Sequence, residues 1–182
     1  MPPAHLESAQ QPTAADDLDA FVVLVQQHNK QASMIRSGED PPVTLRAPRP
    51  STTRKLILIV DDDRALCQLI REALEANGYA AHVEHNGAAA LQFMREDYTL
   101  SQFVGTARLP SLIMVSWELP AKDGFHLVGQ LMTNPNSKLR GIEIMILSSH
   151  ESDAPGVLHL DADDFDEEKL LTMVRSRVES TT

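Results

Sequence analysis

From Lys55 onward, short continuous runs of apolar residues alternate with stretches in which apolar residues recur every three or four positions. The clearest runs occupy residues 56–60, 112–115 and 142–147. Continuous apolar runs of this length are typical of strands that are covered on both faces, as in parallel sheets. Their alternation with helical patterns predicts an α/β domain built on a parallel sheet.

The segments between these runs carry helical periodicity. Residues 66–74, 88–97 and 125–132 each place apolar side chains on one helical face. A weaker strand is expected over residues 81–85. Residues 98–110 then form an unusually long connection, and connections of this length inside compact domains are often functional.

The amino-terminal part of the chain has a different pattern. Leu18, Phe21, Val22 and Val25 recur at helical spacing, which predicts one amphipathic helix over residues 14–34. A single helix of this kind is marginally stable on its own. Its apolar face is therefore expected to dock on its own domain, on a second copy of the chain or on a partner.

Seven of the 11 prolines precede residue 54, and residues 37–53 offer little apolar surface to bury. This composition predicts a linker. The chain of 182 residues is thus divided into an N-terminal extension with one helix (1–36), a Pro-rich linker (37–53) and one folded domain (54–182).

Charge and composition exclude several classes of partner. The net charge of −10 opposes a nucleic-acid interface, because phosphate binding needs clustered Lys and Arg. No stretch approaches the roughly 20 apolar residues needed to cross a membrane. The start of the chain lacks a signal-peptide pattern, and the single cysteine, Cys67, cannot form an internal disulfide. The expected location is the cytoplasm.

Five motifs occur in an order and at spacings that match a known family. They are LILIVDDD at 56–63, NGY at 77–79, LP and DG at 119–124, IMILSS at 144–149 and DFDEEKLLTMV at 164–174. Through them, residues 55–178 resemble the receiver domains of two-component response regulators. The resemblance implies a flavodoxin-like, doubly wound sheet of five parallel strands in the order 2-1-3-4-5. Ligands are then expected at the carboxyl ends of the strands.

In receivers that accept a phosphoryl group, an aspartate at a strand end is the nucleophile and acidic residues hold magnesium. Magnesium neutralises the charge that develops during phosphoryl transfer. The resemblance assigns Asp61 and Asp62 to the acidic pair and the backbone carbonyl of Glu118 to a further metal ligand. It assigns Ser148 to the switch hydroxyl on the fourth strand.

Two chemically important positions depart from the family. Ser116 stands where the acceptor aspartate is expected, and an alcohol is neutral at pH 7 and needs a base to become nucleophilic. Counting back from Phe165, Asp163 stands where a lysine is expected. In our preferred register the fifth strand is residues 157–160. An alternative register uses residues 162–165, and neither register restores the lysine.

The connection between the fourth and fifth strands is also unusual. In the preferred register it consists of residues 149–156 only. A parallel connection usually needs about a dozen residues or more. The fourth helix is therefore expected to be shortened or absent, and in the family this helix belongs to the surface that changes on phosphorylation.

These losses together predict a pseudo-receiver, which is no enzyme and serves as an adaptor or modulator in a bacterial signalling pathway. It would bind a protein partner, such as a histidine kinase or another signalling protein, independently of phosphorylation. A homodimer is a second option. Phe21, Val22, Val25 and Trp117 are the candidate contact residues. No cofactor is expected, with a residual magnesium site as the alternative.

Two other functions stay open at this point. The chain could be a working phosphorelay receiver that uses a substitute acceptor, either Ser116 or one of the aspartates at positions 61–63. It could also be a homo-oligomeric scaffold that is joined through the N-terminal helix across a two-fold axis.

Overall fold

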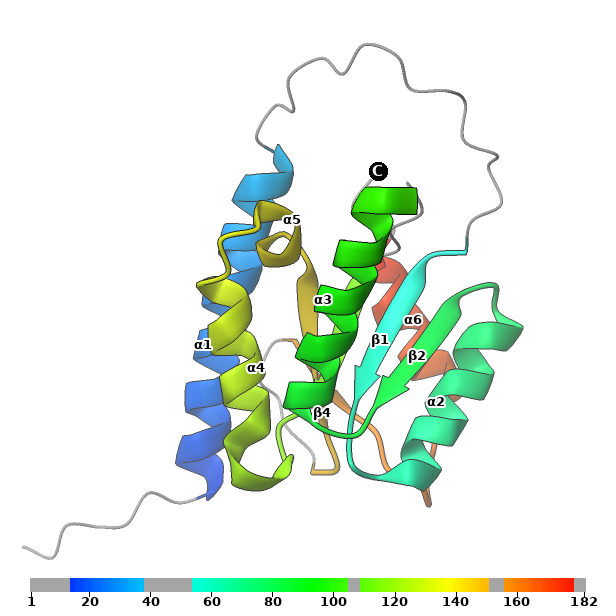
Figure 1. Ribbon diagram of the computed structural model, residues 1–182. Coiled ribbons are helices and arrows are strands. Elements are labelled where there is room, and N and C mark those ends of the chain that lie inside the picture. The colour runs from blue at the N-terminus through cyan, green and yellow to red at the C-terminus, as the bar shows by residue number, and fades with distance from the viewer. Residues whose placement is uncertain (1–13, 38–53, 105–108, 151–155, 179–182) are drawn as a thin grey trace, which may run out of the picture.

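The computed structural model describes residues 14–37, 54–104, 109–150 and 156–178 (Figure 1). Its centre is a five-stranded parallel sheet in the order β2-β1-β3-β4-β5, as the sequence predicted. The strands are β1 (Leu56–Val60), β2 (Ala80–Glu84), β3 (Leu112–Ser116), β4 (Glu143–Ser148) and β5 (Val157–His159). The preferred register of the fifth strand is confirmed, although this strand ends one residue earlier than expected.

Helices cover both faces of this sheet. They are α1 (Ala14–Ser37), α2 (Arg64–Ala76), α3 (Gly87–Val104), α4 (Asp123–Met132), α5 (Ser137–Arg140) and α6 (Glu167–Val178), with a 3-10 turn, η1 (Pro120–Lys122), before α4. Within the described ranges, no helix combines the length and the apolar character that a membrane span requires.

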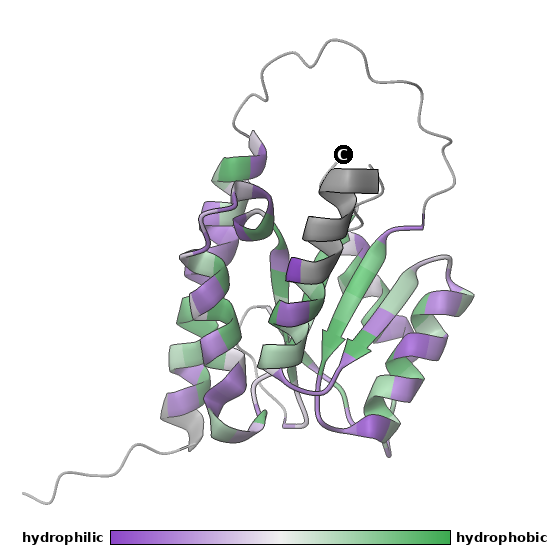
Figure 2. Ribbon diagram, in the orientation of Figure 1, coloured by the Kyte–Doolittle hydropathy of each residue, from purple (hydrophilic) through white to green (hydrophobic). Residues whose placement is uncertain are grey.

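Successive residues of each strand point to opposite faces, which divides the core into two layers. Leu58 and Val60 of β1 pack in the layer formed with α1, α3 and α4. Ile57 and Ile59 pack in the layer formed with α2 and α6. Figure 2 shows the result, an apolar sheet between helices whose polar residues face outward. The continuous apolar runs of the sequence are explained by this double cover.

Helix α1 packs on the sheet face at β4, which is where a helix that connects β4 to β5 would pack. It lies beside α4 and runs in the same direction, opposite to the strands (Figure 1). Its side chains Phe21, Val22 and Val25 are buried in the same cluster as Ile144 and Ile146 of β4. Of the three docking sites left open by the sequence, α1 therefore uses its own domain.

Polar side chains of α1 also form hydrogen bonds with the backbone along the part of the β4 edge that β5 leaves unpaired. Because β5 is short, it pairs only with residues 146–148 of β4. The side-chain amide of Asn29 takes over at Ile144, accepting from its N–H at 2.8 Å and donating to its carbonyl at 2.6 Å. His28 Nε2 lies 2.7 Å from the carbonyl oxygen of Ile142. Helix α1 thus satisfies backbone groups that a longer fifth strand would pair.

A glycine and a lysine make room for α1 and anchor its amino-terminal half. A Cβ atom at Gly124 would lie 3.1 Å from the ring of Phe21 and 3.1 Å from the Ser116 carbonyl oxygen. Lys122, with a positive φ of 57°, reaches Asp17 of α1 at 3.0 Å and lies over the Phe125 ring. The DG motif therefore has a packing role here, because a side chain at position 124 would force the Phe21 ring or the β3 backbone to shift by a few tenths of an ångström.

Two expectations about the elements were wrong or incomplete. Helix α3 continues to Val104, so most of the predicted connection over residues 98–110 is helical. Residues 88–104 contain no Gly or Pro, which explains the extension. The short helix α5 was not predicted. The proposed linker lies outside the described residues, apart from Ser37, which is the last residue of α1.

Candidate functional site

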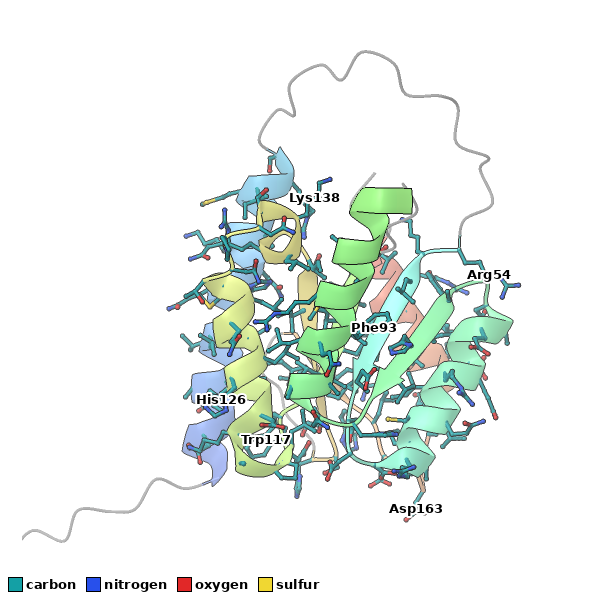
Figure 3. All side chains as sticks on the ribbon, in the orientation of Figure 1. Arg54, Phe93, Trp117, His126, Lys138 and Asp163 are labelled. Carbon is teal, nitrogen blue, oxygen red and sulfur yellow. The ribbon has the colours of Figure 1, made fainter. Side chains whose placement is uncertain are left out.

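Three sequence-predicted site residues meet at the carboxyl ends of the strands. Asp61 directly follows β1, Ser116 is the last residue of β3 and Ser148 is the last residue of β4. Parallel pairing places Ser116 beside Leu147 in the register of β3 and β4. This edge is the lower one in Figure 3, where Trp117 and Asp163 are labelled.

Asp61 is an almost buried carboxyl group, with 4% of the residue exposed. Its Oδ1 accepts a hydrogen bond from the backbone N–H of Asp63 at 3.0 Å. Burial, together with the carboxylates of Asp62, Asp63 and Glu118, raises the pKa of Asp61 to about 6, against the lowering effect of the Asp63 N–H. Among the described residues, no cationic group contributes to this shift, so none of them gives Asp61 the counter-charge that a lysine would supply.

The other two aspartates of the DDD motif have different surroundings. Asp62 is exposed. Asp63 is the N-cap of α2, and its carboxylate accepts from the N–H groups of Ala65 at 2.8 Å and Leu66 at 3.0 Å. One of the three acidic groups therefore has a structural role at the start of a helix.

The tip of β3 carries a hydroxyl that is already hydrogen-bonded. Ser116 is 3% exposed, and its Oγ donates to Glu118 Oε2 at 3.2 Å. The other oxygen of this carboxylate, Oε1, accepts from Ser148 Oγ at 3.2 Å. It also accepts from the backbone N–H of Ser149 at 3.0 Å and from Ser149 Oγ at 3.1 Å. We call Ser116, Ser148 and Ser149 the serine pocket.

His150 lies at the rim of the serine pocket. Its Nδ1 is 3.3 Å from Glu118 Oε1 and 3.1 Å from Ser149 Oγ. In a hydrolytic Ser-His-Glu triad, the acid and the serine contact different nitrogens of the histidine ring. Here both contact the same nitrogen, so these three residues do not form a triad.

Trp117 closes one side of the serine pocket. Its Nε1 donates to Ser148 Oγ at 3.2 Å, and its ring packs partly buried against the core layer that contains α1. The sequence analysis named Trp117 as a candidate contact residue. The ring has both core contacts and an exposed part (Figure 3).

In the part of the chain that the structure describes, no lysine replaces the expected one at the site. Asp163 lies beyond the end of β5 and is exposed, and the β5 residue that pairs with Ser148 is His159. Lys122, which is close in sequence, is turned toward Asp17. The structure thus brings Asp61, Ser116, Glu118 and Ser148 together and leaves Asp163 outside the group.

These residues fit a magnesium ion poorly. Mg²⁺ requires near-octahedral oxygen coordination and dehydrates reluctantly. The Asp61 carboxylate accepts the Asp63 N–H, and the Glu118 carboxylate accepts several hydrogen bonds. Among the described residues, no group of three His, Cys, Asp or Glu side chains could hold a metal ion. The residual magnesium site stays a prediction.

The structure corrects the role of three candidate contact residues. Phe21, Val22 and Val25 are 0%, 5% and 3% exposed, because α1 docks on its own domain. They are not accessible to a partner while α1 is docked. Sequence reasoning also missed the Glu118 side chain, since the resemblance pointed only to its backbone carbonyl. A carboxylate two residues after Ser116 was the available signal.

Comparison with known proteins agrees with the fold. The family model described as "Response regulator receiver domain" matches residues 57–174. Among curated proteins, the response regulator MprA of Mycobacterium ulcerans (strain Agy99) is 30% identical over 132 residues, which are 69% of this chain and 50% of that protein. MprA of Mycobacterium tuberculosis (strain ATCC 25618 / H37Rv) is also 30% identical, with 51% of its length covered. The chain thus spans about half the length of these relatives.

Solved structures with the same fold include the chemotaxis response regulator CheY4 of Vibrio cholerae. It is 22% identical with a TM-score of 0.51, and the match covers 68% of this chain and 98% of that one. A sensor protein from Polaromonas sp. JS666 is 21% identical with a TM-score of 0.53, covering 71% of this chain and 100% of that one. At these identities the comparison supports the fold alone.

Proposed function

We propose that this chain, which belongs to the response regulator receiver domain family of two-component signalling, works by binding other proteins. It does so without aspartyl phosphorylation. It is an adaptor or modulator whose receiver fold serves as a binding scaffold. The partner is a histidine kinase or another protein of a signalling pathway. The acidic character of the chain, with a net charge of −10, favours a partner with a basic surface.

One observation carries this proposal. The tip of β3 presents a serine hydroxyl that is 3% exposed and donates to Glu118. An acyl phosphate forms on a carboxylate nucleophile, and transfer needs cations that neutralise the phosphoryl oxygens. At this site the neighbouring charges that act on Asp61 are all negative. The environment therefore disfavours both the approach of a phosphoryl donor and the reaction.

Of the substitute acceptors, none has a favourable setting. Asp61 is almost buried, and Asp63 caps α2 through its carboxylate. Asp62 is exposed but shares the negative surroundings of the site. The homo-oligomeric alternative required α1 to form the interface between two copies of the chain. In this structure the apolar face of α1 is covered by its own domain.

The direct test is the intact mass of the protein after incubation with acetyl phosphate and Mg²⁺. We expect no adduct of about 80 Da, the mass that one phosphoryl group adds. A receiver domain that retains its aspartate, incubated in parallel, verifies that the reagent is active. A stoichiometric adduct on this chain contradicts the proposal and supports the phosphorelay alternative.

A second test concerns the partner. The full chain is immobilised and exposed to native lysate, once with acetyl phosphate and Mg²⁺ and once with a chelator. We expect the same two-component proteins to be retained in both conditions. Retention that depends on the phosphoryl donor contradicts phosphorylation-independent binding.

A further inference from the structure

We infer that Glu118 is a built-in anionic ligand of the serine pocket, and that it holds the ends of β3 and β4 in one fixed state. This inference rests on the proposed function, since it explains how a module without aspartyl chemistry sets the conformation of its own site. It assigns to the Glu118 side chain a role that neither the family motif nor the comparisons indicate.

The hydrogen-bond donors of the serine pocket are arranged as in an anion-binding site, and the Glu118 carboxylate occupies that site. Glu118 Oε1 faces the Ser149 N–H at 3.0 Å, Ser149 Oγ at 3.1 Å and Ser148 Oγ at 3.2 Å, while Oε2 faces Ser116 Oγ at 3.2 Å. The Ser148 hydroxyl has one proton and also lies 2.9 Å from the His150 carbonyl, so it divides its donation between two acceptors. Hydrogen bonds to a charged acceptor are roughly twice as strong as neutral ones.

These contacts add side-chain links at the ends of two strands that already pair in the sheet. Ser116 belongs to β3, whereas Ser148 ends β4 and Ser149 begins the connection to β5. Glu118 therefore fixes the first residues after β4. Ser116 and Ser148 are 3% and 1% exposed, so the partly exposed Glu118 carboxylate supplies an acceptor to hydroxyls that have little access to water. Buried polar groups that lose their partners are costly, which favours the bound arrangement.

The covalent link gives Glu118 an advantage over any free anion. Asp61, Asp62 and Glu118 make the surroundings negative, which repels dissolved phosphate. A carboxylate carried two residues from Ser116 is held at high effective concentration and cannot diffuse away. The Glu118 carboxylate of the same chain thus occupies the serine pocket, although a dissolved anion such as phosphate would bind there only weakly.

Trp117 provides a natural reporter of this state. It is the only tryptophan of the chain, and its Nε1 donates to Ser148 Oγ. A change in the serine pocket is expected to alter its fluorescence. The amide of Ser149 provides a second reporter, because its N–H is bound by Glu118.

The test compares the wild-type chain with Glu118→Gln and Glu118→Ala by hydrogen exchange at Ser149 and by Trp117 fluorescence. We expect exchange at Ser149 to accelerate about tenfold or more in both variants, as for the loss of a charge-assisted hydrogen bond. Glu75→Gln, an equal charge change at an exposed site on α2, should behave as wild type. Slow exchange in the buried strand β1 verifies that each variant is folded.

Inorganic phosphate then tests the anion character of the pocket. Glu118→Ala removes one of the negative charges and empties the site, so phosphate at saturating concentration should slow exchange at Ser149 again, while chloride at equal ionic strength should not. Unchanged exchange at Ser149 in the variants, or fast exchange that phosphate does not slow, overturns the inference. Phosphorylation of the wild-type chain by acetyl phosphate contradicts the proposed function instead, so the two failures are distinguishable.

Discussion

At the scale of the residue, Asp61 couples the stability of the fold to pH. Its pKa is about 6 in the folded chain, against 3.8 for an unperturbed aspartate, mainly because of burial. The folded state therefore holds this proton more tightly than the unfolded state. The resulting stability is fully present below about pH 4 and is lost as the pH rises through about 6.

We expect Asp61→Asn to remove this dependence. The wild-type free energy of unfolding should fall by about 1–3 kcal/mol between pH 4 and pH 7 from this group, since each pKa unit corresponds to about 1.4 kcal/mol. The variant should lack this decrease and be the more stable protein at pH 7. Urea unfolding at several pH values measures it. Asp163→Asn, at an exposed position of the same sheet edge, should retain the wild-type profile.

His28 has a pH effect of the opposite sign. Burial lowers its pKa from 6.5, despite the hydrogen bond to the Ile142 carbonyl, which acts to raise it. With Nε2 at that carbonyl, the buried Nδ1 atom has no hydrogen-bond partner. A proton added there would be an unpaired donor in the α1–β4 contact. The stability that the neutral ring gives is therefore present above about pH 6.5 and is lost as the pH falls below it.

We expect His28→Gln to abolish this acid-side loss, because an amide can still donate to Ile142 and does not titrate. Thermal unfolding from pH 7.5 down to pH 5.5 measures the difference. His126→Gln is the matched control, since His126 lies exposed on α4 (Figure 3). Equal pH profiles for the two variants would remove His28 as the titrating group.

Motif spacing was sufficient to locate most of the site residues. It placed Asp61, Ser116 and Ser148 at one sheet edge because each directly ends or follows an apolar strand. It could not assign the Glu118 side chain. The direction of a side chain in a turn depends on backbone angles and on partners from another strand, here Ser148 and Ser149.

At the scale of the element, α1 is part of the core rather than an appendage. Phe21 is fully buried and contacts Phe125, with ring centroids 4.7 Å apart. Periodicity predicted the helix and its apolar face, since both are local properties. It could not predict the docking site, because the surface that receives α1 is built by β4 and α4, about 100 residues or more away in the sequence.

We expect Phe21→Ala to lower the free energy of unfolding by about 3–5 kcal/mol, as for other large buried aromatic residues. Val23→Ala, two residues away on the same helix, should change it by less than about 0.5 kcal/mol, because Val23 is 52% exposed. Urea unfolding of the full chain provides both values. Similar, small effects for the two variants would mean that α1 does not contribute to the core in solution.

At the scale of the whole molecule, residues 38–55 connect α1 to β1. Helix α1 and the sheet that begins with β1 pack into one core. This covalent connection makes docking of α1 a unimolecular event. Without it, docking would depend on concentration, by mass action. The integrity of the chain between α1 and β1 is thus part of the stability of the fold.

We expect cleavage at a protease site engineered within residues 38–53 to make the melting temperature dependent on protein concentration. The uncut form of the same variant is the control, and its melting temperature should not change on dilution if the protein is monomeric. Differential scanning calorimetry over a hundredfold concentration range measures both. A cleaved form whose melting temperature is insensitive to dilution would contradict this prediction.

The origin of α1 at the start of the chain also determines the order of events during synthesis. His28 and Ile142, which are hydrogen-bonded in the folded protein, lie 114 positions apart. A growing chain exposes its amino-terminal segment first, so the apolar side of this helix must remain uncovered until β4 leaves the ribosome. Contacts that are so distant in sequence close slowly. Helix α1 is therefore translated well before β4 and is expected to be among the last elements to dock.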